Sequence, residues 1–227
     1  MVSHRLALQA GKQGRLNLRT VLIANPKGGS GKTTLATNLA GYFASRGRHV
    51  VLSDMDRQQS SLQWLERRPS QLPLIHGMDG RGRHADSLSA DWTIIDSPAG
   101  LRGDKLTDAV KTADWVIVPI QPSAFDIGAS QEFLETLREE KAVRKERTFV
   151  AVVGMRIDSR TRSAANLQRY LDKSGFPVMG NLRDAQIYAL VAEQGASLFD
   201  IRPSQVSRDL QQWAPLLHWL VNADRNA

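Results

Sequence analysis

One short segment, KGGSGKTT at residues 27–34, constrains the fold of this 227-residue chain more than any other feature. It follows an apolar run at residues 21–24 and precedes residues 33–45, whose apolar side chains recur at helical spacing. Glycine adopts backbone conformations that other residues avoid, so the three glycines predict a tight loop. The sequence therefore predicts a strand, a loop and a helix in direct succession, as in sheets that are covered by helices.

Further apolar runs continue this pattern along the chain. Four runs are rich in β-branched residues, at residues 49–52, 92–95, 115–118 and 149–153. Continuous runs of this kind are typical of strands that are buried on both faces, and helix-like segments separate most of them. We therefore expect an α/β fold with a mostly parallel twisted sheet and helices on both faces. Residues 69–90 show no clear period and are interpreted as a variable surface segment.

The two ends of the chain have their own patterns. Residues 1–19 carry basic residues and no acidic one, which predicts a flexible basic arm before a single domain at residues 20–227. Residues 204–221 place apolar side chains at three- and four-residue steps. Because proline interrupts helices, we expect this helix to end near Ala214 and a second turn to begin with Pro215. We expect the amphipathic helix to dock on the core.

Composition excludes several classes of protein. The chain has no cysteine, which excludes disulfides, thiolate zinc sites, cysteine nucleophiles and cysteine-ligated iron–sulfur clusters. No run approaches the roughly 18 apolar residues of a membrane-spanning helix, and no signal peptide is evident, so we expect a cytoplasmic protein. Thirty Lys and Arg residues against 23 Asp and Glu give a net charge of +7, which favours a polyanionic partner.

The glycine-rich loop has the residues that bind a triphosphate. Backbone N–H groups converge on phosphate only where side chains are absent, which accounts for Gly28, Gly29 and Gly31. The following helix directs its positive dipole end toward the same phosphates. Lys32 would reach the β- and γ-phosphates, and the hydroxyl of Thr33 would bind Mg²⁺.

A second lysine, Lys27, distinguishes this loop from an ordinary phosphate loop. The sequence KGGSGKT resembles the deviant Walker A motif of the ParA/MinD-type P-loop ATPases. In that family the first lysine reaches the nucleotide of the opposite subunit, so the resemblance gives Lys27 a catalytic role beside Lys32 in an ATP-dependent homodimer. It implies ATP and Mg²⁺ as cofactors. The nucleotide-binding residues it implies are Lys27, Gly28, Gly29, Ser30, Gly31, Lys32, Thr33 and Thr34.

Acidic residues at two strand ends complete the expected site. The sequence DMDRQQ, which begins at Asp54, resembles the family's D-x-D-P-Q segment with Arg57 in place of proline. The resemblance implies that Asp56 orients the attacking water and that Asp54 supports the metal shell. Asp96 ends a segment similar to a Walker B strand, so it joins Thr33 and Asp54 as an expected metal-site residue. No glutamate follows Asp96, and we therefore expect slow hydrolysis.

The resemblance extends over residues 20–200 and is nearest to short ParA proteins that lack an N-terminal helix-turn-helix domain. Family members contact adenine with loops that correspond here to Met155 and Arg156 and to residues 181–183. Relatives with these site residues include partition ATPases that bind nonspecific DNA, MinD-type proteins that bind membranes, and metabolic enzymes or iron–sulfur carriers. The lack of cysteine argues against the carriers, whereas an amide-forming or carboxylating enzyme stays open.

The distribution of charge along the chain favours DNA over a membrane as the expected partner. From Asp209 onward the chain has two acidic residues and one basic residue, which does not favour anionic lipid. Basic residues recur in the C-terminal half and, if they share a face, would bind the DNA backbone without reading bases. They are Arg156, Arg160, Arg162, Arg169, Lys173, Arg183, Arg202 and Arg208.

We therefore predict a ParA-like ATPase with weak intrinsic activity, associated with the bacterial nucleoid in the cytoplasm. ATP would assemble a homodimer that binds nonspecific DNA, and a ParB-like or adaptor protein would stimulate hydrolysis to segregate or position plasmid or chromosomal DNA. The first alternative is a positioning ATPase for a protein cargo, such as a chemotaxis, conjugation or secretion complex. The second is a MinD-like membrane-associated regulator.

Overall fold

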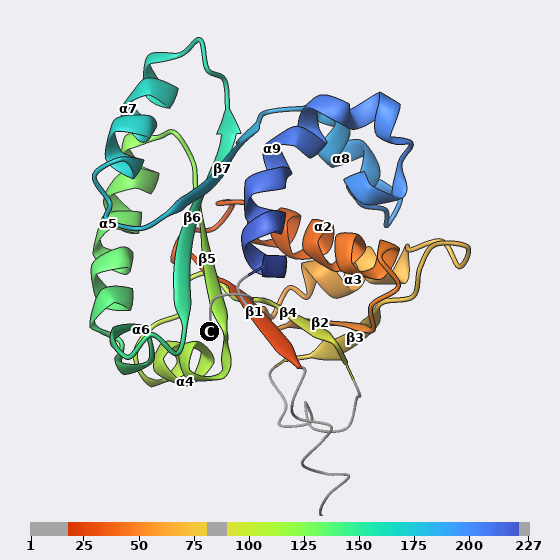
Figure 1. Ribbon diagram of the computed structural model, residues 1–227, viewed down its shortest axis with the longest axis horizontal. Coiled ribbons are helices and arrows are strands. Elements are labelled where there is room, and N and C mark those ends of the chain that lie inside the picture. Colours follow the sequence, from red (N-terminus) through yellow and green to blue (C-terminus); the bar gives the residue numbers. More distant parts are fainter. Residues whose placement is uncertain (1–17, 81–89, 223–227) are drawn as a thin grey trace, which may run out of the picture.

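The computed structural model describes residues 18–80 and 90–222 and contains one parallel sheet (Figure 1). Its seven strands lie in the order β3-β2-β4-β1-β5-β6-β7, and every neighbouring pair is parallel. The strands are β1 (Arg19–Ile23), β2 (Val50–Asp54), β3 (His76–Asp79), β4 (Trp92–Asp96), β5 (Trp115–Ile120), β6 (Phe149–Ile157) and β7 (Val178–Arg183). The predicted parallel sheet is confirmed. Most of the predicted basic arm lies outside the described residues, while Arg19 begins β1.

Helices cover both faces of the sheet, as predicted (Figure 1). One face carries α2 (Lys32–Ser45), α3 (Ser60–Glu66), α8 (Gln186–Glu193), η2 (Leu198–Asp200) and α9 (Pro203–Asn222). The other carries α4 (Asp104–Thr112), α5 (Ala124–Glu139), α6 (Lys141–Arg144) and α7 (Arg162–Leu171). Alternate β1 side chains enter the two resulting cores, since Val21 belongs to the first and Leu22 to the second.

Two sequence-based expectations about secondary structure are wrong. No strand was expected in residues 69–90, yet residues 76–79 form edge strand β3 beside β2; three of its four residues are exposed, in agreement with the interpretation of this segment as surface. The second error is at Pro215, because α9 continues through this proline and its backbone departs from helical geometry at Val206 instead. The side chains of Trp213 and Leu216, on either side of Pro215, are buried in the core. This burial offsets the cost of an interior proline.

The expected docking of the C-terminal helix is confirmed. Trp213 and Leu220 are completely buried, and α9 packs against β7 and η2. The indole Nε1 of Trp213 donates a 3.0 Å hydrogen bond to the hydroxyl of Tyr188 on α8. Within residues 18–80 and 90–222, no helix has both the length and the apolar character needed to cross a membrane.

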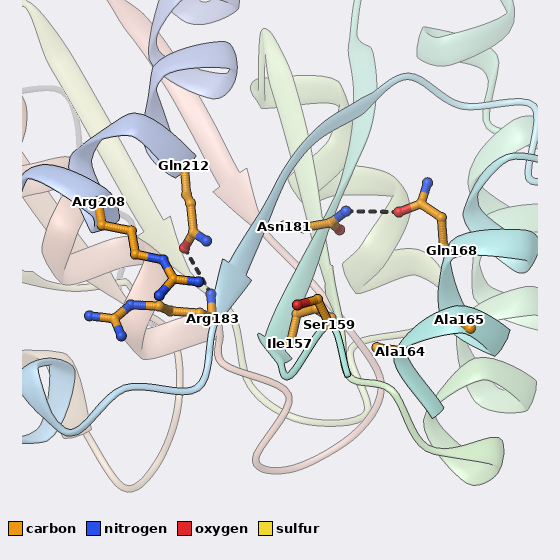
Figure 2. A pocket seen from close by; sticks show the side chains of 9 residues that line it. All are labelled: Ile157, Ser159, Ala164, Ala165, Gln168, Asn181, Arg183, Arg208 and Gln212. Carbon is orange, nitrogen blue, oxygen red and sulfur yellow. Dashed lines mark hydrogen bonds between the residues drawn. The ribbon is translucent and has the colours of Figure 1, made fainter. Parts of the chain in front are cut away.

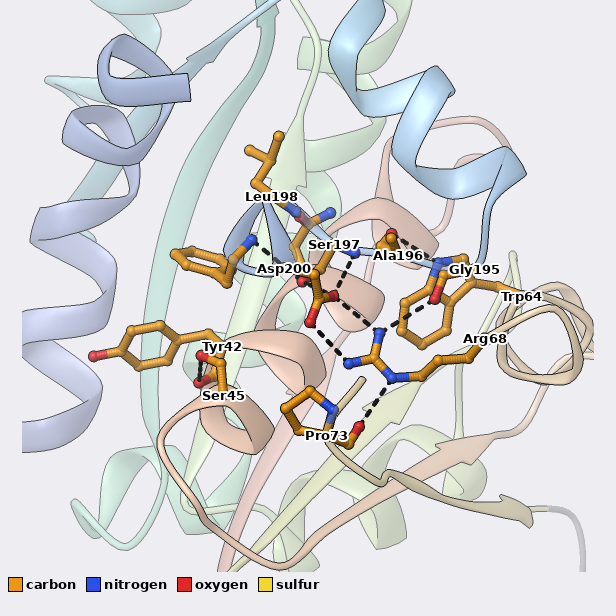
Figure 3. A network of polar contacts seen from close by, with 12 residues as sticks. Tyr42, Ser45, Trp64, Arg68, Pro73, Gly195, Ala196, Ser197, Leu198 and Asp200 are labelled. Atoms are coloured by element: carbon orange, nitrogen blue, oxygen red, sulfur yellow. Dashed lines mark hydrogen bonds and ion pairs between the residues drawn. The ribbon is translucent and has the colours of Figure 1, made fainter. Parts of the chain in front are cut away.

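A buried ion pair ties η2 to the segment that follows α3 (Figure 3). The guanidinium of Arg68, just after α3, donates to both carboxylate oxygens of Asp200 at 2.9 and 3.0 Å. The two side chains are 5% and 2% exposed. Arg68 also donates to the carbonyl oxygen of Gly195 at 3.2 Å and lies 5.4 Å from the ring centroid of Trp64. The pair therefore fixes η2 against α3, which begins beside the site described next.

Candidate nucleotide-binding site

The central strands bring three site segments to one edge of the sheet. Strand β4 pairs with both β1 and β2, and Asp96 is the register partner of Ile23 on one side and of Asp54 on the other. Because these strands are parallel, the segments that follow them leave from the same edge. Ligands of open α/β sheets bind in the crevice outside the carboxyl ends of the strands.

Glycine geometry shapes the loop that follows β1. Gly31 has φ 102° and caps α2 without any side-chain hydrogen bond, so the first N–H groups of the helix remain available to a ligand. A Cβ atom at Gly31 would lie 2.7 Å from the Cε of Met155, at the end of β6. A larger residue would therefore meet backbone strain, and the end of the flexible Met155 side chain would have to shift.

The loop encloses one side of a cavity of about 290 Å³. The cavity brings together nearly all the residues that the sequence predicted for the nucleotide. Its lining is Gly28, Gly29, Ser30, Gly31, Lys32, Thr33, Thr34, Asp56, Gln58, Ser60, Asp96, Ser97 and Ala99. Two predicted residues, Lys27 and Asp54, do not line it.

Lys32 is held inside the loop. Its side chain is buried, and Nζ donates a 2.8 Å hydrogen bond to the carbonyl oxygen of Lys27. Burial lowers the pKa of Lys32, and the charges of Asp96 and Asp56 oppose that shift. The ammonium group is therefore desolvated in advance, and an anionic phosphate beside it would add to the negative charge of Asp96 and Asp56 in favouring its charged form.

The residues around Asp96 fit a magnesium ion. Thr33 Oγ1 donates a 2.8 Å hydrogen bond to Asp96 Oδ2, whereas Asp96 Oδ1 and the Oγ of Ser97 are buried without any hydrogen-bond partner. Hydroxyl and carboxylate oxygens are the ligands that Mg²⁺ prefers. Among the described residues, no group of three or more His, Asp or Glu side chains could hold a metal. Mg²⁺ at Asp96 would therefore take further oxygens from phosphate and water.

Burial raises the pKa of Asp96 to about 7 from its ordinary 3.8. The hydrogen bond from Thr33 and the charge of Lys32 lower the pKa, while the charge of Asp54 adds to the rise. A divalent cation beside this carboxylate would favour its ionised form.

The carboxylates of Asp54 and Asp56 have different roles. Asp54 is completely buried, and its Oδ2 accepts hydrogen bonds from the backbone N–H and the hydroxyl of Ser61 at 2.9 and 2.7 Å. Its Oδ1 accepts from the N–H of Asp56 at 2.9 Å. Asp54 thus anchors the β2–α3 loop from outside the cavity, while Asp56 is half-buried and lines it.

Lys27 differs from the other loop residues. Its backbone N–H donates to Asn25 Oδ1 at 2.8 Å, and its carbonyl accepts from Lys32. Its ammonium group has no hydrogen bond or ion pair with any described residue.

Sequence reasoning missed the side chains that hold the loop in place. Asn25 is buried and donates to the carbonyl oxygen of Pro119 at 2.7 Å and to the hydroxyl of Ser130 at 3.1 Å. Gln121 Nε2 donates to the carbonyl oxygen of Gly29. Gln121 directly follows β5, so a search for polar residues at strand ends, as used above for the acidic residues, could have found it. No pattern singled out Asn25.

The basic residues of the C-terminal half come together only in part. Arg160, Arg183 and Arg208 line a cavity of about 490 Å³ beside the ends of β6 and β7. Arg160 pairs with Asp158 at 2.9 Å and Arg183 with Asp209 at 2.8 Å. Arg208 has no such pair among the described residues. The free positive charge of this surface is therefore lower than the number of arginines suggests.

An adjoining cavity of about 320 Å³ lies between α7, β7 and α9 (Figure 2). Asn181 Nδ2 donates a 2.8 Å hydrogen bond to Gln168 Oε1, and the Arg183 N–H donates to Gln212 Oε1 at 2.9 Å. Residues 181–183, expected near adenine, thus contact α7 and α9. Met155 approaches the phosphate loop itself at Gly31.

Comparisons with known proteins point to a nucleotide-binding family. The model of the family described as CobQ/CobB/MinD/ParA nucleotide binding domain matches residues 21–198. Maintenance of carboxysome distribution protein A of Gloeobacter kilaueensis is 32% identical over 185 residues, which cover 79% of this chain and 81% of that protein. Chromosome-partitioning ATPase Soj of Thermus thermophilus is 29% identical over 192 residues, with coverage of 69% and 77%.

Solved structures share the fold. The complex of a Cyanothece McdA variant with ATP matches with a TM-score of 0.68 at 18% identity, covering 89% of this chain and 95% of that one. ATP or its analogues, and magnesium, occur in structural neighbours, consistent with both cofactors in this family. Together with the family match, the glycine loop and its cavity show that the chain belongs to the CobQ/CobB/MinD/ParA nucleotide-binding family.

Proposed function

We propose that this chain is a ParA-like ATPase that uses ATP-dependent dimerisation to position a cargo along nonspecific DNA. The position of Lys27 carries the proposal, because its ammonium group does not line the cavity that its own loop forms. A second copy facing this edge of the sheet would bring its nucleotide within reach of Lys27. Two identical half-sites would then close around two nucleotides.

Within each half-site, the residues take distinct roles. Lys32 and the N–H groups of the glycine loop would bind the phosphates, and Thr33 and Asp96 would hold Mg²⁺, with Asp54 supporting that site through the β2–α3 loop. When bound, Mg²⁺ would neutralise negative charge on the phosphates. Asp56 would orient the attacking water from the cavity wall. Ser97, not glutamate, follows Asp96, so intrinsic hydrolysis would be slow and a ParB-like or adaptor protein would accelerate it.

Nonspecific DNA fits the charge of the molecule. Arg160, Arg183 and Arg208 share one surface near the end of the sheet, where Arg208 has no acidic partner among the described residues, and the whole chain has a net charge of +7. Backbone contacts from such a surface need no base recognition. If ATP favours the DNA-binding state, DNA must favour ATP retention by the same factor.

The cargo has two candidates. Plasmid or chromosomal DNA is supported by the similarity to Soj, which is named as a chromosome-partitioning ATPase. A protein assembly is supported by the 32% identity to a carboxysome distribution protein. A MinD-like membrane role has less support, because most large apolar residues of α9 are buried in the core, namely Val206, Trp213, Leu216, Leu217 and Leu220.

Binding to random-sequence duplex DNA tests the proposal. The wild type and Arg208→Ala would be titrated with ADP or a slowly hydrolysed ATP analogue over a salt series, with anionic liposomes in parallel. We expect salt-sensitive DNA binding with the ATP analogue alone, weakened in Arg208→Ala. Equal DNA binding with ADP would contradict the switch, and liposome binding instead would favour the membrane regulator. The ATP-bound protein would then be used as bait to capture its partner. A captured DNA-binding protein would indicate a DNA cargo, and a captured adaptor of a protein assembly would indicate a protein cargo.

A further inference from the structure

The first turn of α5 exposes a large aromatic side chain. Phe125 is 83% exposed, more than any other large apolar side chain in the described part of the chain. Ile127, two residues later, packs against the core of its face of the sheet, so the helix is seated while Phe125 points away from that core. Single exposed apolar residues are ordinary on protein surfaces. The evidence for a role of Phe125 therefore comes from the contacts of the turn that carries it, rather than from its exposure alone.

The turn that carries Phe125 is bound to the phosphate loop. Gln121, four residues before Phe125, donates to the carbonyl oxygen of Gly29. Asn25 donates to Pro119, at the end of β5, and to Ser130 on α5, and its Oδ1 accepts from the N–H of Lys27. β1 and β5 are neighbours in the sheet. One hydrogen-bonded frame therefore holds both Lys27 and the start of α5.

The start of α5 is itself well ordered by local bonds. The hydroxyl of Ser123 caps the helix by accepting a 3.1 Å hydrogen bond from the N–H of Asp126. Ser130 is completely buried. Phe125 therefore sits on a fixed support, and an aromatic side chain on such a support loses little conformational entropy when a partner covers it.

We propose that Phe125 is an anchor of the face through which two copies of this chain meet around ATP. The inference rests on the proposed function, in which Lys27 reaches the nucleotide of a second copy. A partner that approaches Lys27 also approaches the α5 turn that shares its frame. In a two-fold dimer each copy contributes its own Phe125, so a single substitution removes two contacts.

Truncation of the side chain tests the anchor. Phe125→Ser is compared with Leu74→Ser, a change at the next most exposed large apolar residue, which is 69% exposed and lies before β3. Dimerisation with a non-hydrolysable ATP analogue and Mg²⁺ is measured by sedimentation, and nucleotide affinity at a protein concentration where every form is monomeric. We expect Phe125→Ser to raise the dimer dissociation constant about tenfold or more with unchanged monomer affinity. Leu74→Ser should dimerise like the wild type.

Site-specific labelling gives a second readout, because the natural chain has no cysteine. In Phe125→Cys, the thiol should react with a maleimide in ADP and be protected in the ATP analogue, whereas Leu74→Cys should react equally in both. Normal dimerisation of Phe125→Ser, or labelling of Phe125→Cys unaffected by the analogue, overturns the anchor and leaves the ATP dimer intact. A wild type that binds the analogue but stays monomeric overturns the proposed function, and the anchor with it.

Discussion

Thr33 Oγ1 donates a 2.8 Å hydrogen bond to Asp96 Oδ2, and the other oxygen of that buried carboxylate has no hydrogen-bond partner. The bond joins the first turn of the loop helix to the end of a strand that is 63 residues away in sequence. Only one of the two carboxylate oxygens of Asp96 therefore has a hydrogen bond, and burial disfavours the charged form of this side chain. A cation at the free oxygen would complete the arrangement, and this explains how the site can respond to both metal and proton.

Proton competition at Asp96 should make Mg²⁺ binding depend on pH. Because Asp96 has a pKa of about 7, it is increasingly protonated below neutrality, and Mg²⁺ must then displace the proton. We expect the Mg²⁺ dependence of ATP-analogue binding to weaken by about tenfold per pH unit below 7. Titration calorimetry between pH 5.5 and 8.5 measures this. The nucleotide titrates in the same range, so Asp96→Asn is the control, and the same pH slope in both proteins would rule out Asp96 as the cause.

The same carboxylate should destabilise the nucleotide-free protein at high pH. Its pKa is 3.8 when exposed and about 7 when folded, so between these values the folded chain keeps a proton that the unfolded chain has lost. The contribution of Asp96 to stability therefore falls as pH rises from about 4 to 7. We expect Asp96→Asn to be more stable than the wild type at pH 8, with a smaller difference at pH 5. Urea unfolding at both pH values measures the difference in unfolding free energy between the two proteins. A stabilisation by Asp96→Asn that is larger at pH 5 than at pH 8 would contradict the raised pKa of Asp96.

The two lysines of the loop should separate nucleotide binding from dimerisation. Lys32 is buried beside Asp96 and Asp56, so Lys32→Ala should weaken ATP binding by roughly a hundredfold. Lys27 lies outside the cavity, so Lys27→Ala should keep most of the nucleotide affinity and lose the ATP-bound dimer. Fluorescent-nucleotide titration and light scattering measure the two properties. Normal dimerisation of Lys27→Ala would show that this lysine does not act across the dimer.

Asp54 should act on the metal site through the loop it anchors. Asp54→Ala leaves the N–H and hydroxyl of Ser61 and the N–H of Asp56 without their acceptor, and should lower the free energy of unfolding by about 3 kcal/mol or more. Hydrolysis should fall because Asp56 loses its position. Chemical denaturation and phosphate release measure these effects. Asp56→Ala is the comparison, and it should lose hydrolysis while keeping most of the stability.

The ion pair between Arg68 and Asp200 should contribute to stability, unlike the exposed pairs. Arg68→Ala leaves a carboxylate that is 2% exposed without its partner and should cost about 3–5 kcal/mol of unfolding free energy. Arg160→Ala is the matched control, because its pair with Asp158 is exposed and should contribute little. Denaturant unfolding of both variants measures the contrast, and equal midpoints would show that the buried pair is dispensable.

Local pattern was enough to predict most of the sheet and the phosphate loop. Continuous apolar runs identified β1, β2, β4, β5 and β6, because strands covered on both faces must be apolar throughout. Strand β3 was missed since its sequence, HGMD, is mostly exposed and its pairing with β2 is a tertiary contact. The course of α9 through Pro215 was missed for a related reason: burial of its neighbours in the core outweighs a local helix-breaking preference.

By itself, the sequence determined that a glycine loop, two lysines and acids at strand ends would meet at one edge of a parallel sheet. These features are local, or follow from strand order and direction. Only the tertiary structure decided that Asp54 faces Ser61 while Asp56 faces the cavity, and that Asn25 and Gln121 fix the loop to the start of α5. It also decided which arginines are neutralised by acids and which aromatic side chain stays exposed. Such properties depend on which side chains share a space after folding, and residues far apart in the chain determine them together.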